Sequence, residues 1–140
     1  MARPTSFRLP EQLLERLDEE AAARGTSVTA LLTNILDEGL KTSRFPGILY
    51  REGTGGRRAG LMGGPDVWEV VRDIKHAPGQ GEERVRLLAD ELGLSDQQIH
   101  LALDFYIAFP EEIDVMIAAD RRAAERVRDV IATRERLLAT

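Results

Sequence analysis

The sequence predicts a mainly α-helical protein with one short N-terminal strand and a glycine-rich segment between two helical parts. Three observations predict this fold class. Apolar residues recur at helical spacing through most of the chain. Residues 5–9 alternate with a period of two, as in a strand. Seven of the twelve glycines lie in residues 43–64, a composition typical of turns and loops. We therefore expect one domain at residues 1–42, a linker or hairpin at 43–64, and a helical domain at 65–140.

The expected strand runs from Thr5 to Leu9. Phe7 and Leu9 face one side of it, and Ser6 and Arg8 face the other. The backbone groups of a strand need partners, and residues 10–42 offer no second strand. We therefore predict that two copies of the chain pair their strands antiparallel about a two-fold axis, which also covers the two apolar side chains. The chain should form a homodimer or a higher even oligomer.

Two helices should follow this strand. Pro10 stands at a typical helix start, because its missing N–H would be unpaired there in any case. Gly25 suits a helix end, and Ser27 suits the N-cap of the second helix. The apolar stripes are Leu13, Leu14, Leu17 and Ala21 in the first helix, and Val28, Leu31, Leu32, Ile35, Leu36 and Leu40 in the second. The expected dimer core consists of Phe7, Leu9, Leu13, Leu17, Leu31, Leu32 and Ile35.

The glycine-rich segment allows two interpretations. Ile48-Leu49-Tyr50 and the stretch from Arg57 to Met62 flank Gly53-Thr54-Gly55-Gly56. This pattern fits either a β-hairpin or a flexible linker.

From Pro65 onward the pattern is helical. Asp66 with Glu69, and Ser95 with Gln98, have the spacing of capping boxes. Helices are expected at residues 84–92, from Ser95 to near Pro110, and from about Glu111 to Leu138, with Gly93-Leu94-Ser95 as a tight turn. The last helix has an apolar stripe that must face its own domain, a second subunit or a foreign partner. Its members are Ile113, Met116, Ile117, Ala124, Val127, Ile131 and Leu138.

Charge is unevenly distributed along the chain. The total is −5, but residues 1–58 carry +1 and residues 59–140 carry −6. Local potential at a docking surface matters more than the total. The positive residues gather in two segments, one with Arg3 and Arg8 and the other with Lys41, Arg44, Arg51, Arg57 and Arg58. A nucleic-acid partner is therefore compatible with the acidic total.

Several classes of protein are not expected from this composition. The chain has no cysteine, which excludes disulfides and thiolate metal sites. It has no apolar run long enough for a membrane span and no apolar signal-peptide region. It also lacks a nucleophile–base pair or a metal-ligand set. We expect a cytoplasmic protein that is not an enzyme and has no cofactor, metal or membrane partner.

The strand, the two helices and their spacing resemble a known family. Ser6-Phe7-Arg8-Leu9-Pro10-Glu11, Leu13-Leu14 with Leu17, and Arg24-Gly25-Thr26-Ser27 are similar to the ribbon-helix-helix repressors of the CopG/Arc/MetJ type. A two-stranded ribbon fits the major groove of double-stranded DNA. The resemblance, over residues 4–41, implies that outward strand residues read bases and that the start of the second helix holds a phosphate. The implied DNA-binding residues are Arg3, Ser6, Arg8, Ser27, Val28 and Thr29, whereas Pro4 occupies a third base-reading position without a side-chain donor.

Four further cations are candidates for the DNA backbone, namely Lys41, Arg44, Arg57 and Arg58. For Arg57 and Arg58 an equal alternative is pairing with the acidic C-terminal half.

A second resemblance concerns residues 56–71 and the Gly93-Leu94-Ser95 turn, which are similar to a small domain of VapB-like antitoxins. Such antitoxins neutralise ribonuclease toxins and repress their own operon. The segment around this turn has helix-turn-helix spacing. Its second helix has no Lys or Arg from residue 96 to 104, which favours a structural or protein-contact role over DNA reading.

Two functions follow from these resemblances. The first is a sequence-specific DNA-binding transcriptional regulator, a repressor that reads the major groove with its ribbon. The alternative is an antitoxin whose acidic C-terminal half neutralises a basic ribonuclease toxin, with DNA binding for autoregulation. The sequence does not rank them.

Overall fold

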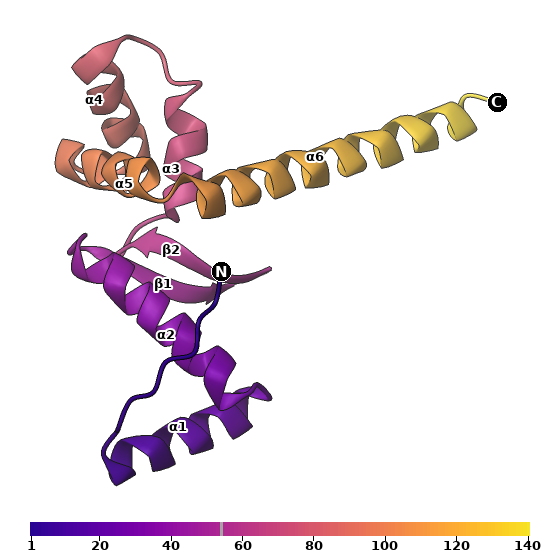
Figure 1. The fold of residues 1–140 in the computed structure, drawn as a ribbon. Helices are drawn as coiled ribbons and strands as arrows, with labels where there is room; N and C mark the ends of the chain where they lie inside the picture. Colours follow the sequence, from indigo (N-terminus) through magenta and orange to yellow (C-terminus); the bar gives the residue numbers. More distant parts are fainter. Residues whose placement is uncertain (54) are drawn as a thin grey trace. The chain divides into compact units, whose positions relative to one another are not determined.

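The computed structural model describes residues 1–53 and 55–140, which form two compact units, residues 1–44 and 45–140 (Figure 1). The first unit contains α1 (Glu11–Arg24) and α2 (Val28–Ser43), which pack against each other. The second contains the strands β1 (Ile48–Gly53) and β2 (Gly56–Leu61) and the helices α3 (Val67–Ile74), α4 (Gly81–Leu92), α5 (Asp96–Ala108) and α6 (Pro110–Leu138).

The ends of α1 and α2 form where the sequence predicts them. Pro10 is the residue before α1, and its carbonyl accepts the first hydrogen bonds of the helix. Gly25 ends α1 with φ of 64°, a left-handed conformation that glycine adopts without a steric penalty. The Ser27 hydroxyl accepts a hydrogen bond from the backbone N–H of Ala30 at 3.1 Å and so caps α2.

Residues 1–10 form neither helix nor strand in the single chain. The strand predicted over Thr5 to Leu9 is therefore absent from one isolated copy. The predicted strand requires the same segment of a second chain as its hydrogen-bond partner, and a single chain does not supply it. The paired ribbon remains a prediction.

The glycine-rich segment contains a β-hairpin, which confirms that alternative over a flexible linker. β1 and β2 pair antiparallel, with Ile48 opposite Leu61 and Gly53 opposite Gly56. Thr54, at the predicted turn, lies outside the described residues. The hairpin belongs to the second compact unit, because Ile48, Ala59 and Leu61 are buried in its core.

The helices of the second unit begin and end at recognisable signals. Both predicted capping boxes, at Asp66 and at Ser95, are present. Helix α4 begins at Gly81, three residues earlier than predicted, and so includes Glu82 and Glu83 in its first turn. Carboxylates there are favourable because they face the positive end of the helix dipole.

The core of the second unit lies between the hairpin and the helices α3, α4 and α5. Its buried apolar residues come from all of these elements and from the start of α6. Phe105 of α5 is fully buried, and its ring contacts those of Phe45, Tyr50 and Phe109 at centroid distances of 5.2 to 6.4 Å. The interior of this unit is therefore closed by its own residues.

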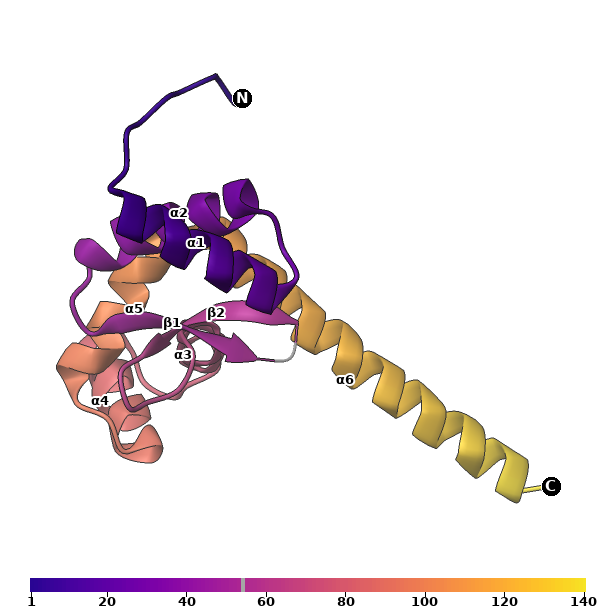
Figure 2. The same ribbon diagram turned by 90° about the horizontal axis from the view of Figure 1, so that it is seen from below.

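Helix α6 leaves that core after its first turns. Ile113 is buried, whereas every residue from 121 to 138 is exposed. Figure 2 shows this part of the helix extending well beyond the other elements of its unit. No helix within residues 1–53 and 55–140 combines the length and the apolar character required to cross a membrane.

Candidate nucleic-acid interface

The predicted base-reading residues lie in the extended N-terminal segment. Arg3, Ser6 and Arg8 are all exposed. Phe7, between Ser6 and Arg8, is also exposed, with 77% of its surface accessible. The candidate base-reading residues and this apolar ring are therefore all accessible in the single chain.

The predicted phosphate site is the first turn of α2. Ser27 and Thr29 are exposed and Val28 is half-buried. The first backbone N–H groups of a helix have no partner within it and point outward along its axis. Because the helix dipole adds positive potential at the same end, this turn can bind an anion such as a phosphate.

The apolar side of the first unit is incompletely covered. Among residues 1–44, all of which the structure describes, the buried side chains are those of Leu17, Ala21 and Leu31. Of the other predicted dimer-core residues, Leu9 and Leu32 are partly buried against this cluster. The remaining three are exposed, and they are Phe7, Leu13 and Ile35.

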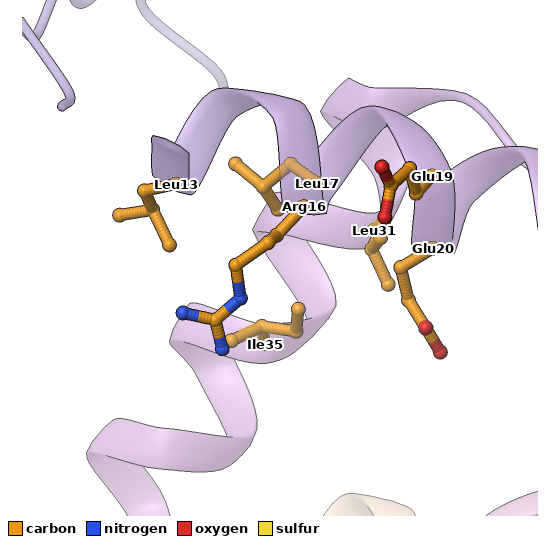
Figure 3. A pocket seen from close by; sticks show the side chains of 7 residues that line it. All are labelled: Leu13, Arg16, Leu17, Glu19, Glu20, Leu31 and Ile35. Atoms are coloured by element: carbon orange, nitrogen blue, oxygen red, sulfur yellow. The ribbon is translucent and has the colours of Figure 1, made fainter. Parts of the chain in front are cut away.

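A groove lies between α1 and α2, beside the exposed Leu13 and Ile35 (Figure 3). Leu13 and Leu17 of α1 line it together with Leu31 and Ile35 of α2. Arg16 extends across it toward Ile35. The lining also includes Glu19 and Glu20. An open apolar groove with a charged margin has the composition of a protein contact surface.

Three exposed apolar residues of the same unit extend this surface and were not included in the predicted dimer core. They are Leu14, Leu36 and Leu40. Their helical spacing placed them in the predicted stripes. That spacing does not show whether a stripe is covered by its own chain or by another.

The four candidate contacts to the DNA backbone have partners within the chain. Lys41 forms an ion pair with Asp37 at 2.9 Å, and both lie on α2. In the hairpin, Arg57 pairs with Glu52 at 3.1 Å. Arg58 pairs with Asp66 at 2.7 Å. Arg44 is exposed at the end of α2. The Arg58 partner, Asp66, belongs to the acidic C-terminal half, whereas the Arg57 partner, Glu52, lies in the hairpin itself.

Asp66 joins the hairpin to α3 and is only 5% exposed. One carboxylate oxygen accepts hydrogen bonds from Arg51 Nε at 3.0 Å and Nη2 at 2.8 Å. The other lies near Arg58 Nε and accepts from the indole N–H of Trp68 at 3.2 Å. The sequence predicted Asp66 as a helix cap but did not predict this network, because a capping pattern is local and the arginine contacts are not.

One part of the chain, its N-terminal segment, matches a known protein family. Residues 3–42 match the family described as ribbon-helix-helix protein, copG family. The matched range covers the extended segment, α1 and nearly all of α2. Proteins with this domain are typically DNA-binding transcription regulators or antitoxins, and they usually dimerise. No curated protein and no solved structure matches the chain, and the comparisons show no VapB-like resemblance for the C-terminal part.

Proposed function

We propose that the chain is a sequence-specific DNA-binding transcriptional regulator, a repressor that acts as a ribbon-helix-helix homodimer. The observation that carries this proposal is the exposed apolar surface of residues 1–44. A unit with so few buried side chains cannot offset the conformational entropy that folding removes. A second copy would cover Phe7, the α1–α2 groove and the exposed stripe of α2 at once.

Pairing of the two extended segments would leave Ser6 and Arg8 of each copy on the outer face of the ribbon. Arginine can donate two hydrogen bonds to guanine O6 and N7 in the major groove, and serine can bond to either base of a pair. Arg3 would flank the ribbon, and the first turns of the two α2 helices would each hold a phosphate. Phosphate contacts would fix the register, while the ribbon would read the sequence.

The antitoxin alternative receives less support from the second unit. Neutralisation of a basic toxin was expected from the acidic charge of the C-terminal half. Residues 121–140, which include the exposed part of α6, instead have six arginines and three acidic residues, a net charge of +3. The acidic residues are concentrated between residues 65 and 120, where thirteen oppose four Lys or Arg. The exposed end of α6 thus has the wrong sign to attract a basic protein.

The DNA-reading role is tested with duplexes selected from a random library by the intact protein. Arg8→Ala should weaken binding to the selected duplex by about 1–3 kcal/mol for each guanine that the arginine reads, without changing the melting temperature. Arg86→Ala removes the same charge from an exposed position of α4 in the second unit and serves as the matched control. Equal affinities of Arg8→Ala and the parent protein would contradict base reading by the ribbon.

A further inference from the structure

The distal part of α6, residues 121–138, has an apolar stripe that no part of its own unit covers. Val127, Val130 and Ile131 are 47 to 59% exposed. Leu137 and Leu138 are more than 70% exposed. In proteins, most helical stability comes from packing of an apolar face and not from the intrinsic propensity of the residues. The stripe therefore requires a partner.

The spacing of this stripe is that of a coiled coil. Residues 117, 124, 131 and 138 follow one another at intervals of seven, and so do residues 113, 120, 127 and 134. Together these two series form the alternating three- and four-residue spacing that brings two helices into contact along a seam. Ile113 is buried in the core of the second unit, and Asp120 accepts a hydrogen bond from Arg72 at 3.3 Å. The part available to a partner thus begins after Asp120.

We propose that this stripe pairs with the same stripe of a second copy of the chain, in antiparallel orientation. The shape of the residues carries the argument. When Val127 of one copy meets Ile131 of the other, Ala124 lies opposite Arg134, and on the adjoining flank Ala123 lies opposite Leu137. Each small side chain then faces a large one, so the layers fill evenly. A parallel pair would place Arg134 against Arg134 and alanine against alanine.

Charge supports the same orientation. In the antiparallel pair, Arg121 of each copy lies on the same flank as Glu135 of the other. This gives two favourable contacts that a parallel pair lacks. Arg128 meets its own copy near the two-fold axis, on the exposed flank, where solvent screening limits the repulsion. These two contacts offset part of the repulsion between the copies, each of which carries a net charge of +3 over residues 121–140.

The short seam is compatible with a chain that already dimerises elsewhere. About two heptads form a weak coiled coil on their own. If residues 1–44 hold two copies together, the second contact becomes intramolecular and gains from a high effective concentration. The pairing can also join two such dimers, which would give the higher even oligomer. In either arrangement the same residues meet.

Single cysteines test the pairing, because the native chain has none. Val130→Cys, near the predicted two-fold axis, should crosslink to its own copy with a short bis-maleimide. Leu137→Cys should not, since the two sites would be more than about 20 Å apart along the pair. Efficient crosslinking of Leu137→Cys would show a parallel pair and overturn the proposed orientation.

A charge on the seam separates pairing from chance collision of mobile helices. Adding Val127→Glu and Ile131→Glu to Val130→Cys should lower the crosslinking rate at least about tenfold, which corresponds to about 1.4 kcal/mol. Val115→Glu is the matched control, because Val115 is 65% exposed on α6 but lies off the stripe. An unchanged rate would exclude the pair and leave a foreign protein as the occupant of the stripe. The readout needs no DNA, so it does not depend on the ribbon reading bases.

Discussion

The two compact units place their apolar residues differently. In the second unit, the hairpin and the helices α3 to α5 enclose a core in which Phe105, Ile99 and Leu88 are fully buried. In the first unit, Phe7 and Ile35 remain exposed on a pair of helices and an extended segment with a small buried cluster. One unit encloses its own core, whereas the other leaves much of its apolar surface open. An apolar stripe in a sequence therefore predicts that its residues are buried, but it does not identify the chain that covers them.

Removal of a ring from the enclosed core should have the largest effect. Phe105→Ala leaves a cavity in a fully buried site, and we expect the free energy of unfolding to fall by about 3–5 kcal/mol. Ile107→Ala, on the same helix but 75% exposed, should change it by less than about 0.5 kcal/mol. Denaturant titration followed by tryptophan fluorescence measures both, because Trp68 packs against this core. Similar decreases for the two variants would contradict the self-contained core.

The same truncation in the open unit should act through assembly. Phe7 is exposed in one chain, so Phe7→Ala would be nearly neutral if the chain were a monomer. If a second copy covers this ring, the decrease should again be roughly 3–5 kcal/mol and appear as dissociation of the dimer. Sedimentation at micromolar concentration measures it. A well-folded monomer of the parent chain would contradict the ribbon dimer.

The buried polar network around Asp66 should also stabilise the second unit. Asp66→Ala removes the helix cap of α3, a hydrogen-bond acceptor of Arg51 and the carboxylate of the ion pair with Arg58. We expect stability to fall by about 1–3 kcal/mol. Glu52→Ala breaks the exposed pair with Arg57 and should cost less than about 1 kcal/mol. Thermal unfolding of the two variants gives the contrast, and equal shifts would exclude a structural role for the network.

The smallest expected effect is the pH dependence of the contact between α4 and α5. The His100 ring nitrogen Nε2 lies 2.9 Å from a Glu82 carboxylate oxygen, and this hydrogen bond raises the pKa of His100. Because the pKa is raised in the folded state, the stabilisation is fully present below the ordinary value of 6.5 and disappears as pH rises through the raised value. Since the pair is exposed, its contribution should be at the lower end of about 0.2–1 kcal/mol.

The measurement is the difference in melting temperature between pH 6 and pH 8. Glu82→Gln removes the charge of the carboxylate and should flatten that difference. The parent protein should be slightly less stable at the higher pH. A greater stability at pH 8 than at pH 6 in the parent, absent from the variant, would reverse the predicted sign.

Local signals were the most predictable part of the fold. Pro10, Gly25 and Ser27 fixed the ends of two helices, because each acts on backbone groups within one turn. The capping boxes at Asp66 and Ser95 did the same for two more. For residues 43–64 the sequence allows both a hairpin and a linker, because glycines permit both. The hairpin forms because Ile48, Ala59 and Leu61 are buried in the core of the second unit. A turn pattern is local and does not predict this burial.

The sequence names candidate residues for the site, and both their DNA contacts and their assembly remain predictions. The alternation of Phe7 and Leu9 with Ser6 and Arg8 is visible in the sequence, but the single chain forms no strand there, and the predicted strand requires a second chain. The interactions that escaped prediction join residues distant in the sequence, such as Arg51 with Asp66. The net charge of the C-terminal half also hides a division within it. The exposed end of α6 is positive, whereas residues 65–120 are negative.

The contacts of Arg51 and Arg58 with Asp66 limit which substitutions the hairpin can accept during evolution. Gly53 and Gly60 have ordinary backbone angles, yet a Cβ at either position would collide with a guanidinium group, that of Arg58 or Arg51 respectively. A side chain at either position would therefore force the neighbouring guanidinium group to move from its place in the network. Replacement of one member alone would meet either a collision or a stranded charge. We expect the two glycines, the two arginines and Asp66 to be inherited as a block, retained together or replaced together among descendants of this sequence.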